Sequence, residues 1–147
     1  MGQFVHSLLL CLALTIFVVP AAAEIVSVEG VVTKVRDGDT IEIGPIAVRL
    51  KGVSAPELKE PLGHKSKAFL VDLVMGKNIR CGLNGDKTYD RFVGNCFLRG
   101  QDIGASVISA GLALDCPRYS GGLYRNFELK IAKKQIKLPR YCRLSSD

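Results

Sequence analysis

Three charged side chains that could act together on a phosphate lie near one another in the sequence: Asp39, Arg49 and Glu57. The planar guanidinium of an arginine makes two charge-assisted hydrogen bonds to a phosphate, whereas a carboxylate can hold a cation or accept a proton. A groove that only bound anions would gain nothing from these carboxylates, because a carboxylate repels phosphate. The combination therefore predicts phosphate chemistry that involves a metal ion or a proton transfer.

The sequence around these side chains predicts strands that would bring them together. Thr40–Ile43 and Ile46–Leu50 are rich in β-branched and apolar residues, which favours two short strands. Ile25–Val35 predicts a strand before them. Asp37-Gly38 indicates the connecting hairpin turn, because glycine takes the positive φ that a primed turn requires. We expect these three strands to form an antiparallel meander.

The rest of the chain predicts three helices and two more strands. The helices are marked by apolar residues at helical spacing and by Asp102 as a candidate N-cap, and the strands flank the turn residues Asn84-Gly85. The predicted helices are Ser66–Met75, Asp102–Ala110 and Tyr124–Gln135, and the predicted strands are Lys77–Leu83 and Arg91–Leu98. Five short strands with a helix between the third and the fourth predict an α+β fold, a five-stranded OB-fold β-barrel with three helices.

An ordered set of short motifs resembles the staphylococcal nuclease (thermonuclease) family. The set is D-G-D-T, R-L, P-E, Y-x-R and G-L-A, and the resemblance covers roughly residues 29–138. It implies an exported nuclease that hydrolyses phosphodiester bonds of DNA and RNA with little sequence specificity and prefers single strands. It also implies Ca²⁺ as a cofactor.

The resemblance assigns roles to five charged residues. Arg49 and Arg91 match the two catalytic arginines of the family, and Glu57 matches the glutamate proposed there as general base. Asp39 matches an aspartate that binds calcium, and Asp37 lies beside it in the same predicted turn.

Two tyrosines are candidates for nucleic-acid binding, and the chain departs from the family at three positions. Tyr89 matches a residue that stacks on a base or sugar, and Tyr119 is a second candidate; packing at the barrel edge is the alternative for either. Ser54 and Ala55 stand where the family has a calcium-binding aspartate and a threonine, and Asp90 stands where it has a glycine. A serine offers a metal only a neutral oxygen, so the predicted metal residues Asp39, Asp37 and Ser54 indicate weak binding.

Simpler interpretations exist for each charged residue and for the domain. The arginines could be surface charges or local ion pairs of little energetic value, and the carboxylates could be turn or loop residues. The alternative function is a catalytically impaired OB-fold module that binds single-stranded nucleic acid. A third function, oligosaccharide binding, is disfavoured because the chain has no Trp.

The N-terminal segment predicts export. Residues 1–23 contain no Lys, Arg, Asp or Glu, and the apolar run Leu8–Val19 precedes Ala21-Ala22-Ala23, so we expect a signal peptide cleaved after Ala23. The alternative, a membrane anchor, would need an apolar span of about 20 residues. Residues 24–147 would then form one secreted or periplasmic domain, a monomer without stable membrane association. Its net charge of +6 would attract nucleic acid or other polyanions.

The cysteines predict two disulfides. Cys11 lies in the predicted signal peptide, which leaves Cys81, Cys96, Cys116 and Cys142. An even number of cysteines in an exported chain implies disulfides, with three possible pairings. No C-x-x-C pattern is present, which disfavours a zinc site. Our hypothesis is Cys81–Cys96, across one hairpin, and Cys116–Cys142, which would tie the chain end to the body.

Overall fold

The computed structural model describes residues 26–144, so the predicted signal peptide lies outside the described residues. The elements, in chain order, are β1 (Val26–Val35), β2 (Thr40–Ile43), β3 (Ile46–Leu50), β4 (Val53–Ser54), α1 (Gly63–Val74), β5 (Asn78–Thr88), β6 (Arg91–Leu98), β7 (Gln101–Asp102), α2 (Ile103–Ser109), β8 (Leu114–Asp115), α3 (Pro117–Ser120), the 3-10 helix η1 (Arg125–Phe127), α4 (Lys130–Gln135) and the 3-10 helix η2 (Arg140–Cys142).

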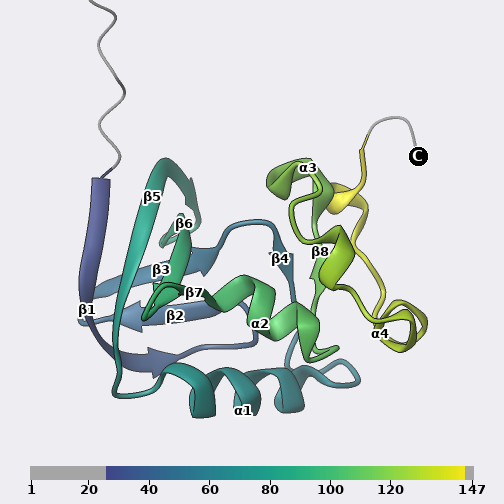
Figure 1. Cartoon of the computed structure of the whole chain (residues 1–147), viewed down its shortest axis with the longest axis horizontal. Helices are drawn as coiled ribbons and strands as arrows, with labels where there is room; N and C mark the ends of the chain where they lie inside the picture. The colour runs from purple at the N-terminus through teal and green to yellow at the C-terminus, as the bar shows by residue number, and fades with distance from the viewer. Residues whose placement is uncertain (1–25, 145–147) are drawn as a thin grey trace, which may run out of the picture.

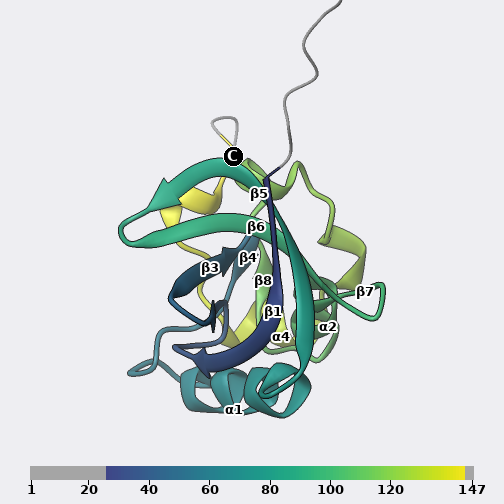
Figure 2. The same cartoon turned by 90° about the vertical axis from the view of Figure 1, so that its left-hand side faces the viewer.

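Five strands form a closed barrel, as the sequence predicts (Figures 1 and 2). The strand order is β3-β2-β1-β5-β6, in which neighbours are antiparallel, and a parallel pairing of β3 with β6 closes the barrel. The interior is apolar because alternate side chains of each strand point inward. Fully buried examples are Ile41 of β2, Val48 of β3 and Ile79 of β5. The α+β, OB-fold prediction is confirmed.

Helices cover one end and one side of the barrel. α1 lies along the end below β2 in Figure 1, and its buried Leu70 and Val74 join the barrel core. It begins at Gly63, earlier than the predicted Ser66. α2 begins as predicted, because the Asp102 carboxylate accepts a hydrogen bond of 3.0 Å from the Ala105 backbone N–H.

The third predicted helix is wrong as a continuous segment. The structure forms η1 and α4 there, with extended backbone at Glu128 and Leu129 between them. The Glu128 carboxylate, 9% exposed, accepts a 3.0 Å hydrogen bond from the Asp115 backbone N–H and pairs with Lys133 at 2.6 Å. Because these contacts hold Glu128 against the body of the protein, one helix does not run through this position.

The predicted turn at Asn84-Gly85 is also wrong. β5 continues past these residues to Thr88, which pairs with Arg91, so the hairpin turn is formed by Tyr89 and Asp90. Asn84 and Gly85 lie where the pairing of β5 with β6 changes register, between Leu83 and Lys87. The hairpin is therefore longer than the sequence indicates, and its tip extends beyond the barrel (Figure 2).

Both predicted disulfides are present. Cys81 faces Cys96 across the β5–β6 pairing, and Cys116 is bonded to Cys142, which joins the start of α3 to η2. Disulfides are typical of proteins in oxidising compartments. Within residues 26–144 we find no helix that has both the length and the apolar character needed to cross a membrane.

Candidate active site

A buried ion pair forms the centre of the candidate site. It joins Asp39, in the bend before β2, to Arg49 of β3. The Arg49 guanidinium lies 3.0 Å from the Asp39 carboxylate, and their side chains are 18% and 6% exposed. Burial raises the pKa of Asp39 to about 6, although Arg49 opposes this. Burial lowers the pKa of Arg49, but Asp39 and Tyr141 more than offset this and raise it. The guanidinium therefore remains charged.

A hydrogen-bonded relay connects this pair to the second arginine. The Thr40 hydroxyl, which is fully buried, donates to the Asp39 carboxylate at 3.0 Å and accepts from Arg91 Nη1 at 3.1 Å. Arg91 Nε also donates to the Thr88 carbonyl at 3.3 Å. Asp39 and Thr40 thus hold both arginines, and Arg91 has neutral oxygens rather than a carboxylate as its partners.

Strand register explains why these residues meet. Thr40 lies opposite Arg49 in the antiparallel β2–β3 pairing. The parallel β3–β6 pairing sets Arg49 opposite Val93, two residues after Arg91 at the start of β6. Closure of the barrel therefore brings the two predicted catalytic arginines to the same place.

Asp90, the acidic departure from the family pattern, pairs with Arg36 and not with Arg91. Arg36 Nη1 lies 2.7–2.9 Å from both Asp90 carboxylate oxygens, and its Nε lies 2.6 Å from Glu42. The hydrogen bond from Arg36 lowers the pKa of Asp90. The interpretation of Arg91 and Asp90 as a local ion pair is therefore wrong.

An open cleft of about 850 Å³ lies beside this relay. Five predicted residues line it: Arg49, Glu57, Tyr89, Arg91 and Tyr119. Glu57 is exposed. Tyr89, at the hairpin tip, is 91% exposed and its ring centroid lies 5.8 Å from the Arg91 guanidinium carbon. The cleft therefore combines two fixed guanidinium groups, an accessible carboxylate and accessible aromatic rings.

The three predicted metal residues are not among the residues that line the cleft. Asp37 accepts a 3.0 Å hydrogen bond from the Asp39 backbone N–H, and Ser54 is buried in β4. Asp39 also accepts a 3.4 Å hydrogen bond from the Ala55 backbone N–H. In the part of the chain that the structure describes, no group of three or more His, Cys, Asp or Glu gathers as a metal-binding cluster.

Sequence reasoning missed three residues of the site. Thr40 links the two arginines, and its place in the D-G-D-T motif was the available signal. Lys87 lines the cleft, with its Nζ 4.4 Å from the Phe92 ring centroid. Tyr141 also lines the cleft. The sequence signal for Tyr141 was its position directly before Cys142. The disulfide partner of Cys142 is Cys116, which lies three residues before Tyr119, a predicted residue of the cleft.

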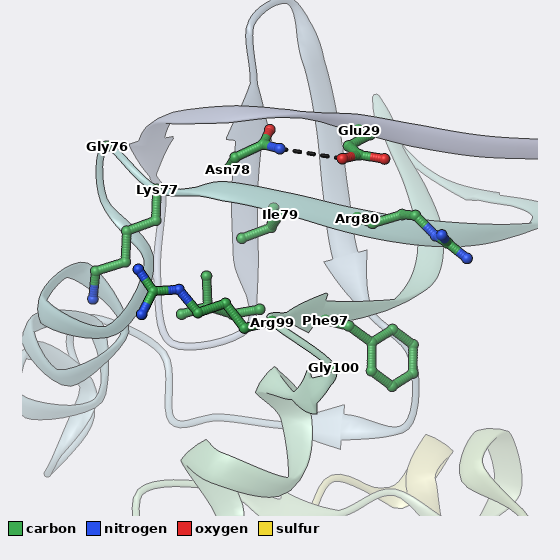
Figure 3. Close-up of a pocket in the computed structure, with 10 residues that line it drawn as sticks. Glu29, Gly76, Lys77, Asn78, Ile79, Arg80, Phe97, Arg99 and Gly100 are labelled. Carbon is green, nitrogen blue, oxygen red and sulfur yellow. Dashed lines mark hydrogen bonds between the residues drawn. The ribbon is translucent and has the colours of Figure 1, made fainter.

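A second hollow, of about 780 Å³, contains none of the predicted site residues (Figure 3). It lies at the other end of the β5–β6 hairpin, and Arg80, Phe97 and Arg99 are among the residues that line it. Figure 3 shows Asn78 donating to the Glu29 carboxylate there, at 3.1 Å. Glu29 also lines this hollow, and among the described residues no hydrogen bond joins Arg80 to Arg99, so an arginine here differs from the two linked arginines of the cleft.

The family model described as "Staphylococcal nuclease homologue" matches residues 47–137. The chain belongs to this family. The matched range includes Arg49, Glu57, Tyr89, Arg91 and Tyr119, whereas the Asp37–Thr40 segment and Tyr141 lie outside it. The resemblance inferred from the short motifs is confirmed.

Of three curated relatives, two are named endonucleases and the third is named a biosynthesis protein. The chain is 35% identical over 94 residues to an "Uncharacterized endonuclease" of Haemophilus influenzae, a match that covers 60% of this chain and 53% of the relative. It is 30% identical over 98 residues to an "Uncharacterized endonuclease" of Escherichia coli O157:H7, covering 63% and 64%. It is 38% identical over 102 residues to "Succinoglycan biosynthesis protein ExoI" of Rhizobium meliloti, covering 61% and 53%. The matches thus span about half to two thirds of these relatives.

The bend before β2 is packed against α1 more closely than a side chain would permit. A Cβ at Gly38 would lie 2.0 Å from Ser66 Oγ and 2.7 Å from the Ala55 Cβ. Gly38 does not have the positive φ that the sequence interpretation assumed, so close approach is the reason for glycine here. Ser66 is fully buried, and among the described residues its hydroxyl is the one buried side-chain polar atom without a hydrogen-bond partner.

We predict that Ser66→Ala raises the free energy of unfolding by about 1 kcal/mol, because it removes an unsatisfied buried hydroxyl. Urea denaturation measures this. Ser106→Ala is the matched control in α2, where the hydroxyl donates to the Asp102 carbonyl at 2.8 Å; it should lower the free energy of unfolding by a similar amount. Equal destabilisation by both substitutions would contradict the prediction.

Proposed function

We propose that this protein is a nuclease that hydrolyses phosphodiester bonds of DNA and RNA with little sequence preference. The observation that carries the proposal is the relay from Arg49 through Asp39 and Thr40 to Arg91, beside a cleft that also contains the Glu57 carboxylate. Two guanidinium groups fixed by protein contacts are suited to a phosphate whose negative charge increases in the transition state. The names of two curated relatives, both endonucleases, agree with the proposal.

The proposed reaction assigns a task to each charged residue. Glu57 accepts a proton from a water molecule, whose oxygen attacks the phosphorus as the bond to the leaving oxygen breaks, and the leaving oxygen takes up a proton from solvent. Arg49 and Arg91 donate hydrogen bonds to the phosphate oxygens, and their charge stabilises the five-coordinate transition state. Fixing the arginines before the substrate binds avoids the cost of reorganising them during the reaction.

The aromatic residues and the charge of the chain support a single-stranded substrate. Tyr89 and Tyr119 expose their rings in the cleft, and unpaired bases can stack on such rings without sequence preference. The net charge of +6 favours binding to a polyanion. We propose further that the protein is exported and acts as a monomer; its two disulfides support export.

A weakly held divalent cation, calcium by preference, is part of the proposal. Asp37 and Asp39 lie in one bend, and the Asp37 carboxylate contributes to the raised pKa of Asp39, a repulsion that a cation would relieve. Ser54 would add at most a neutral oxygen. Two carboxylates fit a weak site rather than a closed cage, since calcium takes six or more oxygen ligands. When bound, the cation would supply positive charge to the substrate phosphate.

The second candidate function is a module that binds single-stranded nucleic acid without cleaving it. It is favoured by the engagement of Asp39 with Arg49, which leaves fewer carboxylate oxygens for a metal ion. Both functions use the same cleft, so binding does not separate them. Cleavage does.

We predict that Glu57→Gln and Arg91→Ala each lower the cleavage rate of single-stranded DNA by about 10²–10³ and leave the fold intact, because each removes one group that acts in the transition state. Gel assays of end-labelled DNA measure the rate, and circular dichroism checks the fold. Arg80→Ala is the matched control, an exposed arginine of the second hollow that should retain full activity. Full activity of either site variant would refute the assigned roles, and an inactive wild type would favour the binding module.

For the metal, we predict that Ser54→Asp tightens calcium binding and raises activity at low calcium, because it restores a carboxylate. The wild type should need calcium in the range of about 10⁻⁴–10⁻³ M. Isothermal titration calorimetry measures uptake, with Ser109→Asp, at an exposed serine of α2, as the control for added charge. If neither the wild type nor Ser54→Asp takes up calcium and a chelator leaves cleavage unchanged, the arginines act without a metal.

A further inference from the structure

Two half-exposed tyrosines line the cleft from the C-terminal part of the chain: Tyr119 in α3 and Tyr141 in η2. They are 49% and 48% exposed. Tyr119 is a predicted nucleic-acid contact, but Tyr141 has no role in the proposed reaction and lies beyond the residues that match the family model. Because both rings are half-exposed and line the cleft, a ligand in the cleft can contact them.

The Cys116–Cys142 disulfide holds both tyrosines at the cleft. Tyr141 directly precedes Cys142, and Tyr119 lies one helical turn after Cys116. Cys116 is itself anchored, because its backbone N–H donates to the Gly52 carbonyl at 2.8 Å. Gly52 has φ +71°, and a Cβ there would lie 2.5 Å from the Ser120 Cβ. α3 therefore packs directly on the segment that follows β3, the strand of Arg49.

Tyr141 shares the cleft with Arg49. Both side chains line it, and the Tyr141 ring is half-exposed there. Arg49 thus has a buried carboxylate as its partner and a half-exposed phenol in the same cleft. The hydroxyl of tyrosine can accept a hydrogen bond from the guanidinium and donate one to a phosphate oxygen.

We propose that Tyr141 is a substrate-binding residue of this cleft: its ring contacts the nucleotide beside the bound phosphate. The inference rests on the proposed function, since it assumes a nucleic-acid substrate. Together with Tyr119 it gives the C-terminal wall of the cleft two aromatic surfaces. Bases in a duplex are already stacked on each other, so this wall selects single strands.

The test separates the ring from the hydroxyl. The dissociation constant (Kd) for a short fluorescent single-stranded DNA is measured by anisotropy in the presence of chelator, and kcat and KM are measured with calcium. Tyr141→Ala should weaken binding by about 5- to 150-fold, the effect of losing one base–aromatic stack. Tyr141→Phe keeps the ring and should therefore keep the wild-type Kd, KM and kcat.

Phe127→Ala is the matched control, because Phe127 is an aromatic residue of similar exposure, 46%, that does not line the cleft. It should leave Kd, KM and kcat unchanged. The paired substitution Cys116→Ala/Cys142→Ala should weaken binding as Tyr141→Ala does, whereas Cys81→Ala/Cys96→Ala should not. If a cysteine pair fails to fold, as thermal melting would show, the Tyr141 variants decide the question.

The outcomes distinguish this inference from the nuclease proposal. If the wild type cleaves DNA but Tyr141→Ala binds as tightly as the wild type, the role of Tyr141 is refuted and the nuclease proposal stands. If the wild type binds DNA without cleaving it, the nuclease proposal fails, and the Kd of Tyr141→Ala still decides the role of Tyr141. An equal loss of binding in Tyr141→Ala and Phe127→Ala would also refute it, and a wild type that neither binds nor cleaves would refute both.

Discussion

The buried pair of Asp39 and Arg49 is the interaction on which the candidate site depends. A carboxylate removed from water is costly unless it is paired and hydrogen-bonded, and Asp39 has Arg49, the Thr40 hydroxyl and the Ala55 N–H as partners. The same contacts fix the direction of the guanidinium. The Thr40 hydroxyl in turn accepts a hydrogen bond from Arg91, which the closing β3–β6 pairing brings beside Arg49. The strand register that closes the barrel therefore also brings the residues of the site together.

This arrangement creates a competition for Arg49. Asp39 already occupies part of its hydrogen-bonding capacity, whereas a phosphate would need the rest. The guanidinium has five N–H donors, so it can contact both. Arg91 has only neutral oxygens among the partners described above, so its charge remains available to a substrate. Asp90 pairs with Arg36 and not with Arg91, so less of its charge opposes that of Arg91. The cleft therefore stays favourable to anions despite two carboxylates near its arginines.

Patterns of local sequence predicted most of the fold. Runs of β-branched and apolar residues located β2 and β3 at their observed bounds, β6 was also predicted at its observed bounds, and Asp102 marked the start of α2. Predictions failed where a tertiary contact overrides a local signal. Asn84-Gly85 has turn chemistry, but the pairing of β5 with β6 continues beyond it, and the bonds of Glu128 divide the third helix.

The site was predictable in its charged members and not in the contacts that connect them. Arg49 and Glu57 stood out because their residue types suit phosphate chemistry, and Arg91 was assigned by the resemblance to the family. The role of Thr40 depends on a hydroxyl that bridges two strands, and the place of Tyr141 depends on a disulfide between distant residues. Neither relation is visible in local spacing. The reason for Gly38, close packing against Ser66, likewise lies in a contact across the fold.

The central claim is that a guanidinium fixed by Asp39 binds the phosphate during cleavage, and Arg49→Lys tests it most directly. Lysine keeps the positive charge but lacks the planar fork that can contact Asp39 and a phosphate together. The measurement is kcat on single-stranded DNA for the wild type and Arg49→Lys, with thermal melting to confirm that both are folded. We expect cleavage by the wild type and a kcat about 100-fold lower for Arg49→Lys. Equal cleavage by the two proteins would contradict the claim, because a mobile point charge would then suffice.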